Sequence, residues 1–194
     1  MGFEQNPYLK GLEYFTELFN AIQNQQSLVI EYQGFKQKCI SSIVFHPWYL
    51  KQYNNRWFLL GFNDTYKALS NLAIDRIISI TNSQEHYIQN RDINFDEFFE
   101  DVVGVSINPS ESTEKVVIKI SKDVWPYIES KPLHGSQKIK NKTDNYIEIE
   151  LDVQVNHELM ALLFSYMDAV EIIEPLALRE KFKTISESIS NQYL

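Results

Sequence analysis

Basic and aromatic side chains are interleaved in the first half of the sequence, a combination typical of surfaces that bind anions. Residues 36–76 contain six lysines and arginines but only two aspartates, a net charge of +4. Guanidinium groups bind phosphate oxygens in pairs, and aromatic rings stack on nucleobases. The candidates for anion contact are Arg76, Arg56, Lys51 and Lys67, and those for stacking include Tyr49, Tyr53, Tyr32, Trp48 and Tyr66. His46, which could donate to a phosphate, completes the candidate site.

Each basic candidate also has a structural interpretation. Arg76 has Asp75 and Asp64 as possible ion-pair partners. Lys51 and Lys67 fit the solvated charges that protect strand edges. His46 precedes Pro47, so a role in capping a turn is the alternative to phosphate contact.

The elements that must position these residues follow from hydrophobic periodicity. Residues 8–26 have apolar side chains at spacings of three and four, which predicts an amphipathic helix. Residues 27–82 change to short alternating runs separated by turn residues. Strands are expected at 28–32, 36–45, 48–53, 56–62, 67–74 and 77–81. Many short strands without a helical interruption favour a small β-barrel.

A different pattern follows in the second half. Residues 83–114 form an acidic connector with eight acids against Arg91, and one short helix is expected from Phe95 to Val102. Residues 115–194 predict the order strand, helix, strand, strand, helix, strand, helix, with Asn156 capping the second helix. That order is the ferredoxin-like split arrangement with one additional helix. We therefore expect an α+β protein divided at 1–26, 27–82, 83–114 and 115–194.

Composition excludes several classes of protein. The net charge is −8, but residues 1–83 carry +1 and residues 84–194 carry −9, so the basic module must be considered alone. Cys39 is the only cysteine, which excludes an intrachain disulfide and fits a reducing compartment. No export signal or apolar run long enough for a membrane span is visible. We expect a cytoplasmic protein without membrane contact.

Enzymatic and metal-binding motifs are not visible in the sequence. It has no glycine-rich phosphate loop and no nucleophile or zinc-protease signature. Four scattered histidines do not form a metal-ligand pattern. We therefore expect no enzymatic activity, no metal site and no cofactor.

Three segments, taken in order, resemble the WYL domain family of bacterial regulators. They are His46-Pro47-Trp48-Tyr49-Leu50-Lys51, then Arg56-Trp57-Phe58-Leu59-Leu60-Gly61-Phe62, and then Ile74-Asp75-Arg76-Ile77. The triplet that names the family corresponds to Trp57-Phe58-Leu59, so its tyrosine is replaced by Phe58. The second half is similar to the extension that often follows this domain, in Pro132-Leu133-His134 and Glu174-Pro175-Leu176 among others.

The resemblance implies an Sm-like or SH3-like barrel, in a transcription regulator that senses a ligand and forms homodimers; the helix predicted before it should pack on the barrel. It favours ligand contact over structural pairing for Arg56 and Arg76. The family's DNA-binding helix-turn-helix is not visible before the barrel, so we expect it in an upstream segment or in a partner. An arginine that the family often carries shortly before Asp75 is also absent, since Ser70-Asn71-Leu72-Ala73 stands there.

Two functions follow as hypotheses. In the first, the chain is an effector-sensing regulatory domain that binds an anionic ligand, single-stranded nucleic acid such as single-stranded DNA, or a nucleotide. In the second, the barrel is structural and the chain is a protein-interaction or dimerisation module. The clustered basic residues and the three motifs favour the first, whereas the overall acidity and the missing arginine favour the second.

Overall fold

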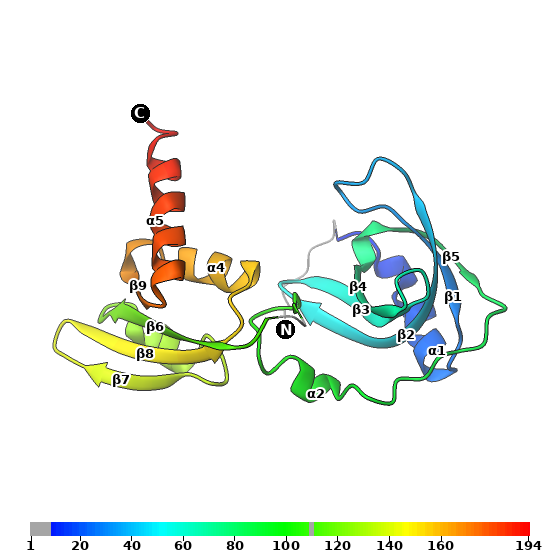
Figure 1. Cartoon of the computed structure of the whole chain (residues 1–194), viewed down its shortest axis with the longest axis horizontal. Helices are drawn as coiled ribbons and strands as arrows, with labels where there is room; N and C mark the ends of the chain where they lie inside the picture. The colour runs from blue at the N-terminus through cyan, green and yellow to red at the C-terminus, as the bar shows by residue number, and fades with distance from the viewer. Residues whose placement is uncertain (1–8, 109–110) are drawn as a thin grey trace, which may run out of the picture. The chain divides into compact units, whose positions relative to one another are not determined.

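The computed structural model describes residues 9–108 and 111–194, which divide into two compact units between Phe95 and Asp96 (Figure 1). Each unit has its own sheet and its own hydrophobic core. The protein is therefore a mixed α/β structure with two antiparallel sheets and an N-terminal helix, as the sequence predicts. No helix in the part of the chain that the structure describes is long and apolar enough to span a bilayer.

The N-terminal unit is a five-stranded antiparallel sheet with one helix packed on it. Its elements are the 3-10 turn η1 (Leu12–Tyr14), α1 (Phe15–Gln23), β1 (Leu28–Tyr32), β2 (Ser41–Tyr53), β3 (Arg56–Asn63), β4 (Ala68–Ala73), the 3-10 turn η2 (Ile74–Arg76) and β5 (Ile77–Asn82). The strands are ordered β4-β3-β2-β1-β5. The predicted helix is thus present but shorter, because it begins only after η1.

The core of this unit lies between α1 and the concave face of the sheet. Leu18 and Ala21 from the helix pack with Ile30, Phe45 and Leu59 from successive strands, and all five are buried. Alternation along β1 places Leu28 and Ile30 inward and Glu31 outward, as the period of a strand requires. The helical spacing and the strand alternation therefore meet in a single core.

Strand β2 differs from the sequence prediction. We expected two strands interrupted at His46-Pro47, but the structure has one strand of 13 residues through both. β2 pairs with β1 as far as Phe45 and with β3 from Phe45 onward. Proline cannot donate a ladder hydrogen bond, and the register with β3 shifts between Pro47 and Tyr49. The proline thus marks a bulge where the strand changes partner, not an end.

Barrel closure stays a prediction. Within residues 9–108 no ladder joins β4 to β5, the two edges of the sheet, and η2 connects them instead. The strand order and the covering helix are what an Sm-like barrel would need, but the closing hydrogen bonds are not formed.

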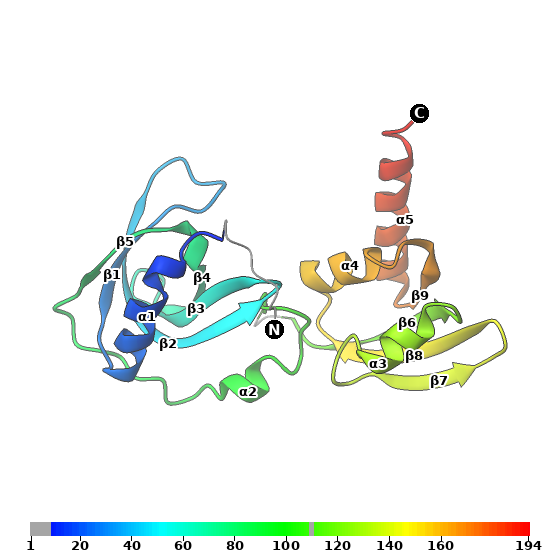
Figure 2. The same ribbon diagram turned by 180° about the vertical axis from the view of Figure 1, so that it is seen from behind.

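The C-terminal unit is a four-stranded antiparallel sheet, with strand order β7-β8-β6-β9 (Figure 2). The short helix α2 (Phe95–Phe98) lies at the boundary between the units. The remaining elements are β6 (Glu114–Ser121), α3 (Trp125–Ser130), β7 (Lys138–Lys142), β8 (Tyr146–Val153), α4 (His157–Phe164), the 3-10 turn η3 (Met167–Ala169), β9 (Val170–Glu174) and α5 (Leu176–Ser190). This connectivity is that of the predicted split arrangement.

The start of α4 confirms a sequence prediction at the level of one hydrogen bond. The side chain of Asn156 accepts from the backbone N–H of Leu159 at 2.8 Å. That bond satisfies one of the donors that a helix start leaves unpaired. Its amide nitrogen donates to the carbonyl oxygens of Val103 and Ser106, so the same residue fixes the connector to the helix.

Gly61→Ala tests the close approach of β3 to the bulge in β2. An added methyl group at Gly61 would overlap the carbonyl oxygen of His46 and a ring carbon of Phe45. The backbone at His46 cannot move aside as a flexible side chain can. We therefore expect the free energy of unfolding of the N-terminal unit to fall by about 1–3 kcal/mol. Chemical denaturation followed by tryptophan fluorescence measures the change. Gly34→Ala in the same unit is the control, since only the side chain of Gln37 lies near its position, and an equal loss in both variants would contradict the account.

Candidate functional site

Two arginines from separate elements converge on one aspartate in the N-terminal unit. Arg56 begins β3, and Arg76 ends η2, the turn that also carries Asp75. Arg56 Nη1 lies 3.8 Å from Asp75 Oδ2, and Arg76 Nε lies 3.8 Å from Asp75 Oδ1. The side chain of Asp75 is only 11% exposed, whereas that of Arg56 is 49% exposed. The arrangement therefore presents one accessible guanidinium beside a second, more enclosed one.

An exposed aromatic ring completes this cluster. The guanidinium carbon of Arg76 lies 4.4 Å from the centroid of the Phe35 ring, a cation–π contact. Phe35 is 72% exposed, unusual for so large an apolar side chain. We call Arg56, Asp75, Arg76 and Phe35 together the paired-arginine surface.

The loop between β1 and β2 holds Phe35 in place and adds charge. The backbone N–H of Gln33 donates to the carbonyl of Arg76 at 3.1 Å, and that of Gly34 donates to the Gln37 side chain at 2.8 Å. Lys36 and Lys38 follow Phe35 in this loop, and both are exposed. Our sequence reasoning did not select Phe35, although its position beside Lys36 in the basic segment was a usable signal.

Tyr32 lies beneath the paired-arginine surface as part of the core. Its ring is 8% exposed. Burial raises the pKa of its hydroxyl, and the nearby positive charge of Arg76 acts in the opposite direction. The hydroxyl therefore stays neutral. Because the ring is buried beside Arg76, it offers no face on which a base could stack.

His46 lies in the interior of the sheet and not at the paired-arginine surface. It is 1% exposed, and its Nδ1 accepts a hydrogen bond from the backbone N–H of Ile88 at 3.1 Å. Burial lowers its pKa, so the ring is held neutral. The Tyr87 hydroxyl also donates to the Pro47 carbonyl at 2.6 Å. Together these contacts attach the segment after β5 to β2, which is a structural role.

Lys67 also lies apart from the two arginines. It follows the far end of β3 and pairs with Asp64 in the β3–β4 turn, with Nζ 2.6 Å from Oδ1. The strand between it and Arg56 has eight residues, which span about 25 Å. Lys67 therefore cannot contact the same phosphate as Arg56.

Tyr49, Lys51 and Tyr53 lie on one face of β2, all half-buried. Tyr53 is directly opposite Arg56 in the β2–β3 ladder, which brings it to the same end of the hairpin. The Tyr49 ring instead stacks on Phe95, with centroids 4.7 Å apart and an interplanar angle of 12°. The register therefore places Tyr53 beside the paired-arginine surface, with Lys51 two residues earlier on the same face, opposite Phe58.

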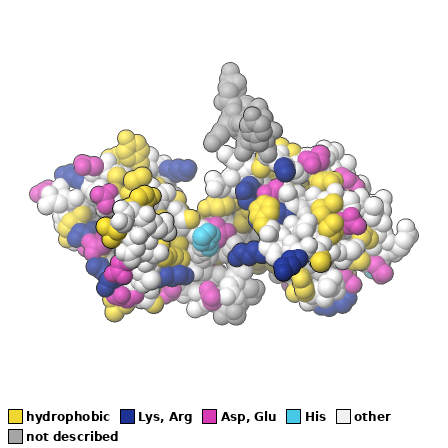
Figure 3. Space-filling view, turned by 90° about the horizontal axis from the view of Figure 1, so that it is seen from above, with side chains coloured by type: hydrophobic (Ala, Val, Ile, Leu, Met, Phe, Trp, Pro, Cys, Tyr) yellow, Lys and Arg dark blue, Asp and Glu magenta, His cyan; other side chains and the backbone are white. Residues whose placement is uncertain are grey.

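The C-terminal unit has a separate apolar groove of about 630 Å³. Its walls come from the end of α4, η3, β9 and α5, and hydrophobic side chains gather on this unit in Figure 3. The rings of Phe164 and Phe182 stack with centroids 4.1 Å apart. Met167 and Ile189 remain 80% and 45% exposed at its edges. The groove is thus an apolar surface that the unit's own core leaves uncovered.

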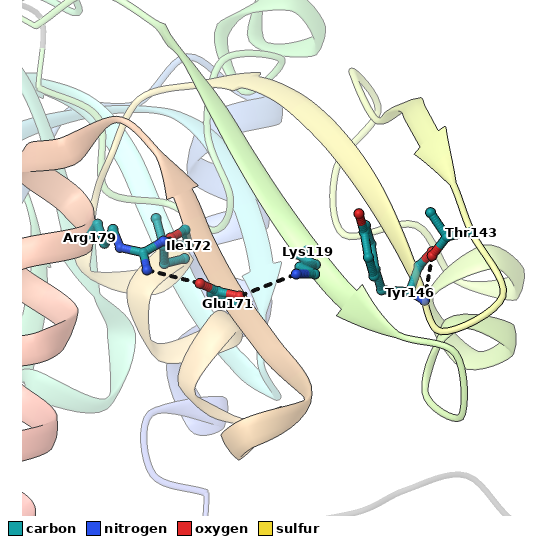
Figure 4. A network of polar contacts seen from close by, with 6 residues as sticks. All are labelled: Lys119, Thr143, Tyr146, Glu171, Ile172 and Arg179. Carbon is teal, nitrogen blue, oxygen red and sulfur yellow. Dashed lines mark hydrogen bonds and ion pairs between the residues drawn. The ribbon is translucent and has the colours of Figure 1, made fainter.

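A charged network forms the rim of this groove (Figure 4). Arg179 Nη1 donates to the carbonyl oxygen of Ile172 at 2.6 Å, and its Nη2 donates to Glu171 at 2.9 Å. Glu171 also lies 3.8 Å from Lys119, whose ammonium group lies over the ring of Tyr146. This network anchors the start of α5 to β9 and fixes one wall of the groove.

The described side chains do not form a metal centre. Within residues 9–108 and 111–194, no three His, Cys, Asp or Glu side chains lie close enough together to hold a metal ion.

Comparison with known families places two domains on the chain. The family model of the WYL domain matches residues 13–82, and that of the WCX domain matches residues 112–189. The first match contains the whole five-stranded sheet, and the second contains the four-stranded sheet with α3, α4 and all but the last residue of α5. No curated protein matches the sequence.

Two solved structures are similar to the chain as a whole. Proteasome accessory factor B/C (PafBC) of Arthrobacter aurescens has 15% identity and a TM-score of 0.39, and the match covers 99% of this chain and 28% of that one. A CRISPR Cas-related protein has 11% identity and a TM-score of 0.58, covering 94% of this chain and 52% of that one. The second similarity shows a shared fold. The chain spans between about a quarter and about half of the length of these structures.

The burial of His46 predicts how stability depends on pH. Below about pH 6.5 the unfolded histidine gains a proton that the folded one resists, so stability should fall as the pH decreases through this range. The loss amounts to about 1.4 kcal/mol for each unit by which folding lowers the pKa. His46→Asn keeps an acceptor for the Ile88 N–H but cannot titrate. We expect a shallower decline for this variant in denaturation at about pH 7.5 and about pH 5.5, and identical slopes would show that His46 is not held neutral.

Proposed function

The chain belongs to the WYL-domain family, with a WCX domain following the WYL domain, and we propose that it is an effector-sensing regulatory domain. Its ligand is an anion, single-stranded nucleic acid or a nucleotide. The ligand binds at the paired-arginine surface of the N-terminal unit. This proposal rests on one observation above all, the convergence of Arg56 and Arg76 beside the exposed ring of Phe35.

The chemistry of the paired-arginine surface suits a nucleotide unit. A phosphate can accept from both guanidiniums, whose donors are arranged for bidentate contacts with oxygen anions. The exposed Phe35 ring offers a face for a base, and such stacking contributes about 1–3 kcal/mol per base. Lys36 and Lys38, exposed in the adjacent loop, can contact neighbouring phosphates. Cation and ring together favour a single strand, whose bases are unpaired, over a duplex.

A route exists from this surface to the start of the described chain. Asp75 and Arg76 belong to η2, and Ile74 of the same turn is buried in the core. The carbonyl of Ile74 lies against Gly11, immediately before η1, so closely that no side chain would fit there. Gly11 has a φ of +86°, which glycine adopts without strain. A ligand that shifts η2 would therefore act on the segment leading into α1.

This route supports a regulatory role in a larger protein. The family resemblance implies a DNA-binding module before the WYL domain or in a partner, and the similar solved structures are longer than this chain. A ligand changes the activity of such a module only if it binds one of two conformations more tightly. We propose that the η2–Gly11 contact is where the two conformations differ.

Single-strand binding that depends on the two arginines is the first expectation. Fluorescence anisotropy with a labelled oligothymidylate of about 12 nucleotides should show binding that weakens with salt. Arg56→Ala and Arg76→Ala should each weaken it by about tenfold or more, since hydrogen bonds to charged groups contribute about 1.5–3 kcal/mol. Lys67→Ala removes the same charge at the distant turn and is the matched control.

The outcomes separate the ligand classes. A loss of affinity in both arginine variants but not in Lys67→Ala supports the proposed site. Equal affinity in all four proteins contradicts it. If the oligonucleotide does not bind but mononucleotides displace a labelled nucleotide from the protein, the ligand of the site is a nucleotide. Tighter binding to duplex than to single strand contradicts the stacking role of Phe35.

The apolar groove in the C-terminal unit favours a second candidate function, dimerisation. Leu178, Phe182, Ile185 and Ile189 form one stripe along α5, buried at its start and 45% exposed at Ile189. Such a stripe is the surface that a second copy of the chain would cover. The two functions are compatible, since a sensor can act through a dimer.

Ile189→Asp tests the groove. A charge at the exposed end of the stripe should destabilise a dimer and shift the protein to monomer in sedimentation velocity. Ser188→Asp adds the same charge to α5 at a residue that does not line the groove, and it should leave the assembly unchanged. A monomeric wild type, or a dimer indifferent to both substitutions, would contradict the dimerisation function.

A further inference from the structure

We propose that Asp75 is a built-in competitor for the anionic ligand. Its carboxylate lies between the two guanidiniums that would hold a phosphate, and it thereby sets the affinity of the site. The inference rests on the proposed function, because it concerns the same two arginines.

The contacts of Asp75 are electrostatic but leave hydrogen bonds unmade. Its oxygens lie 3.8 Å from Arg56 Nη1 and from Arg76 Nε. Charge-assisted N–H···O bonds are about 2.7–2.9 Å long. Asp75 Oδ1 and Arg76 Nε are both buried without a hydrogen-bond partner. The carboxylate therefore neutralises part of the charge on both arginines, while the side chain of Arg56, 49% exposed, keeps donors that another anion can reach.

The fold prevents Asp75 from simply moving away. It is the middle residue of η2, between Ile74, which is 1% exposed, and Arg76, whose carbonyl is bound by Gln33. Its side chain is 11% exposed. Asp75 therefore stays beside both guanidiniums, and an anion that binds them must compete with its carboxylate.

Arg56 is the partner that can exchange one anion for the other. Its side chain is 49% exposed, against 29% for Arg76, which is also held against the Phe35 ring. Binding should therefore turn Arg56 from Asp75 toward the ligand while Arg76 stays in place. The two arginines and the Asp75 carboxylate together carry a net charge of +1, whereas the arginines alone carry +2. The carboxylate therefore lowers the affinity of the site for anions in general.

Asp75→Asn removes the charge with little change in shape. At a separation of about 5 Å, one unit of repulsion between Asp75 and a bound phosphate corresponds to an affinity change of about tenfold at low salt. We expect the full chain carrying this substitution to bind the labelled oligothymidylate about tenfold more tightly than wild type in anisotropy. The gain should shrink as salt is added.

Asp64→Asn is the matched control. It removes the same charge from the same unit, but Asp64 pairs with Lys67 at the distant turn. It should leave the affinity for the oligothymidylate close to that of wild type. If Asp64→Asn tightens binding as much as Asp75→Asn, net charge explains the effect and the competitor role is wrong.

Arg56→Ala distinguishes failure of this inference from failure of the proposed function. If Arg56→Ala weakens binding while Asp75→Asn leaves it unchanged or weaker, the site is confirmed and the competitor role is wrong. If wild type and both variants all fail to bind oligothymidylate or nucleotide, the proposed function fails and the inference with it.

Asp75→Glu is the second test variant if Asp75→Asn does not fold. It keeps the charge but extends the carboxylate by one methylene further between the guanidiniums. Stronger competition should then reduce the affinity below that of wild type. Unchanged or tighter binding by a folded Asp75→Glu variant overturns the proposal.

Discussion

One long strand changes partner in the middle of the N-terminal unit, and the other elements are arranged around that change. β2 pairs with β1 through Phe45 and with β3 beyond it, and the exchange falls at a proline that cannot donate. β3 can pass this point only because Gly61 has no side chain. The same ladder ends with Tyr53 opposite Arg56. A slip of one residue would reverse every side chain on β3, so the position of Arg56 depends on this register.

Local charge governs the candidate site more than the charge of the whole chain does. The protein carries −8, yet exposed ions separated by more than about 10 Å are screened from each other at ordinary salt. At the proposed site the nearby charges are those of Arg56, Arg76 and Asp75, beside the exposed ring of Phe35. Since η2 carries Asp75 and Arg76 and packs against Gly11, a single turn joins the proposed anion site to the segment before α1.

The sequence predicted most helices and strands, but it did not predict which side chains from distant segments meet. Helical spacing and strand alternation are local, and they correctly identified α1, the strict alternation of β8 and the Asn156 cap of α4. The interruption expected at His46-Pro47 was wrong, because a strand can pass a proline through a bulge when its partner changes. Arg56 and Arg76 were selected from the basic cluster, with the resemblance favouring ligand contact over structural pairing, but their meeting at Asp75 depends on contacts between distant segments. Burial of His46 and the separation of Lys67 depend on such contacts too, and no local pattern reveals them.

An amide chemical-shift titration can locate the anion that we propose is bound at the paired-arginine surface. Isotopically labelled protein is titrated with oligothymidylate, and the shifts are mapped onto the chain. We expect the largest changes in the loop around Phe35 and in η2 and a smaller response at Gly11, while the turn at Lys67 and the groove beside α5 stay unchanged. Changes centred on that groove, or none at all in the N-terminal unit, would contradict the proposal.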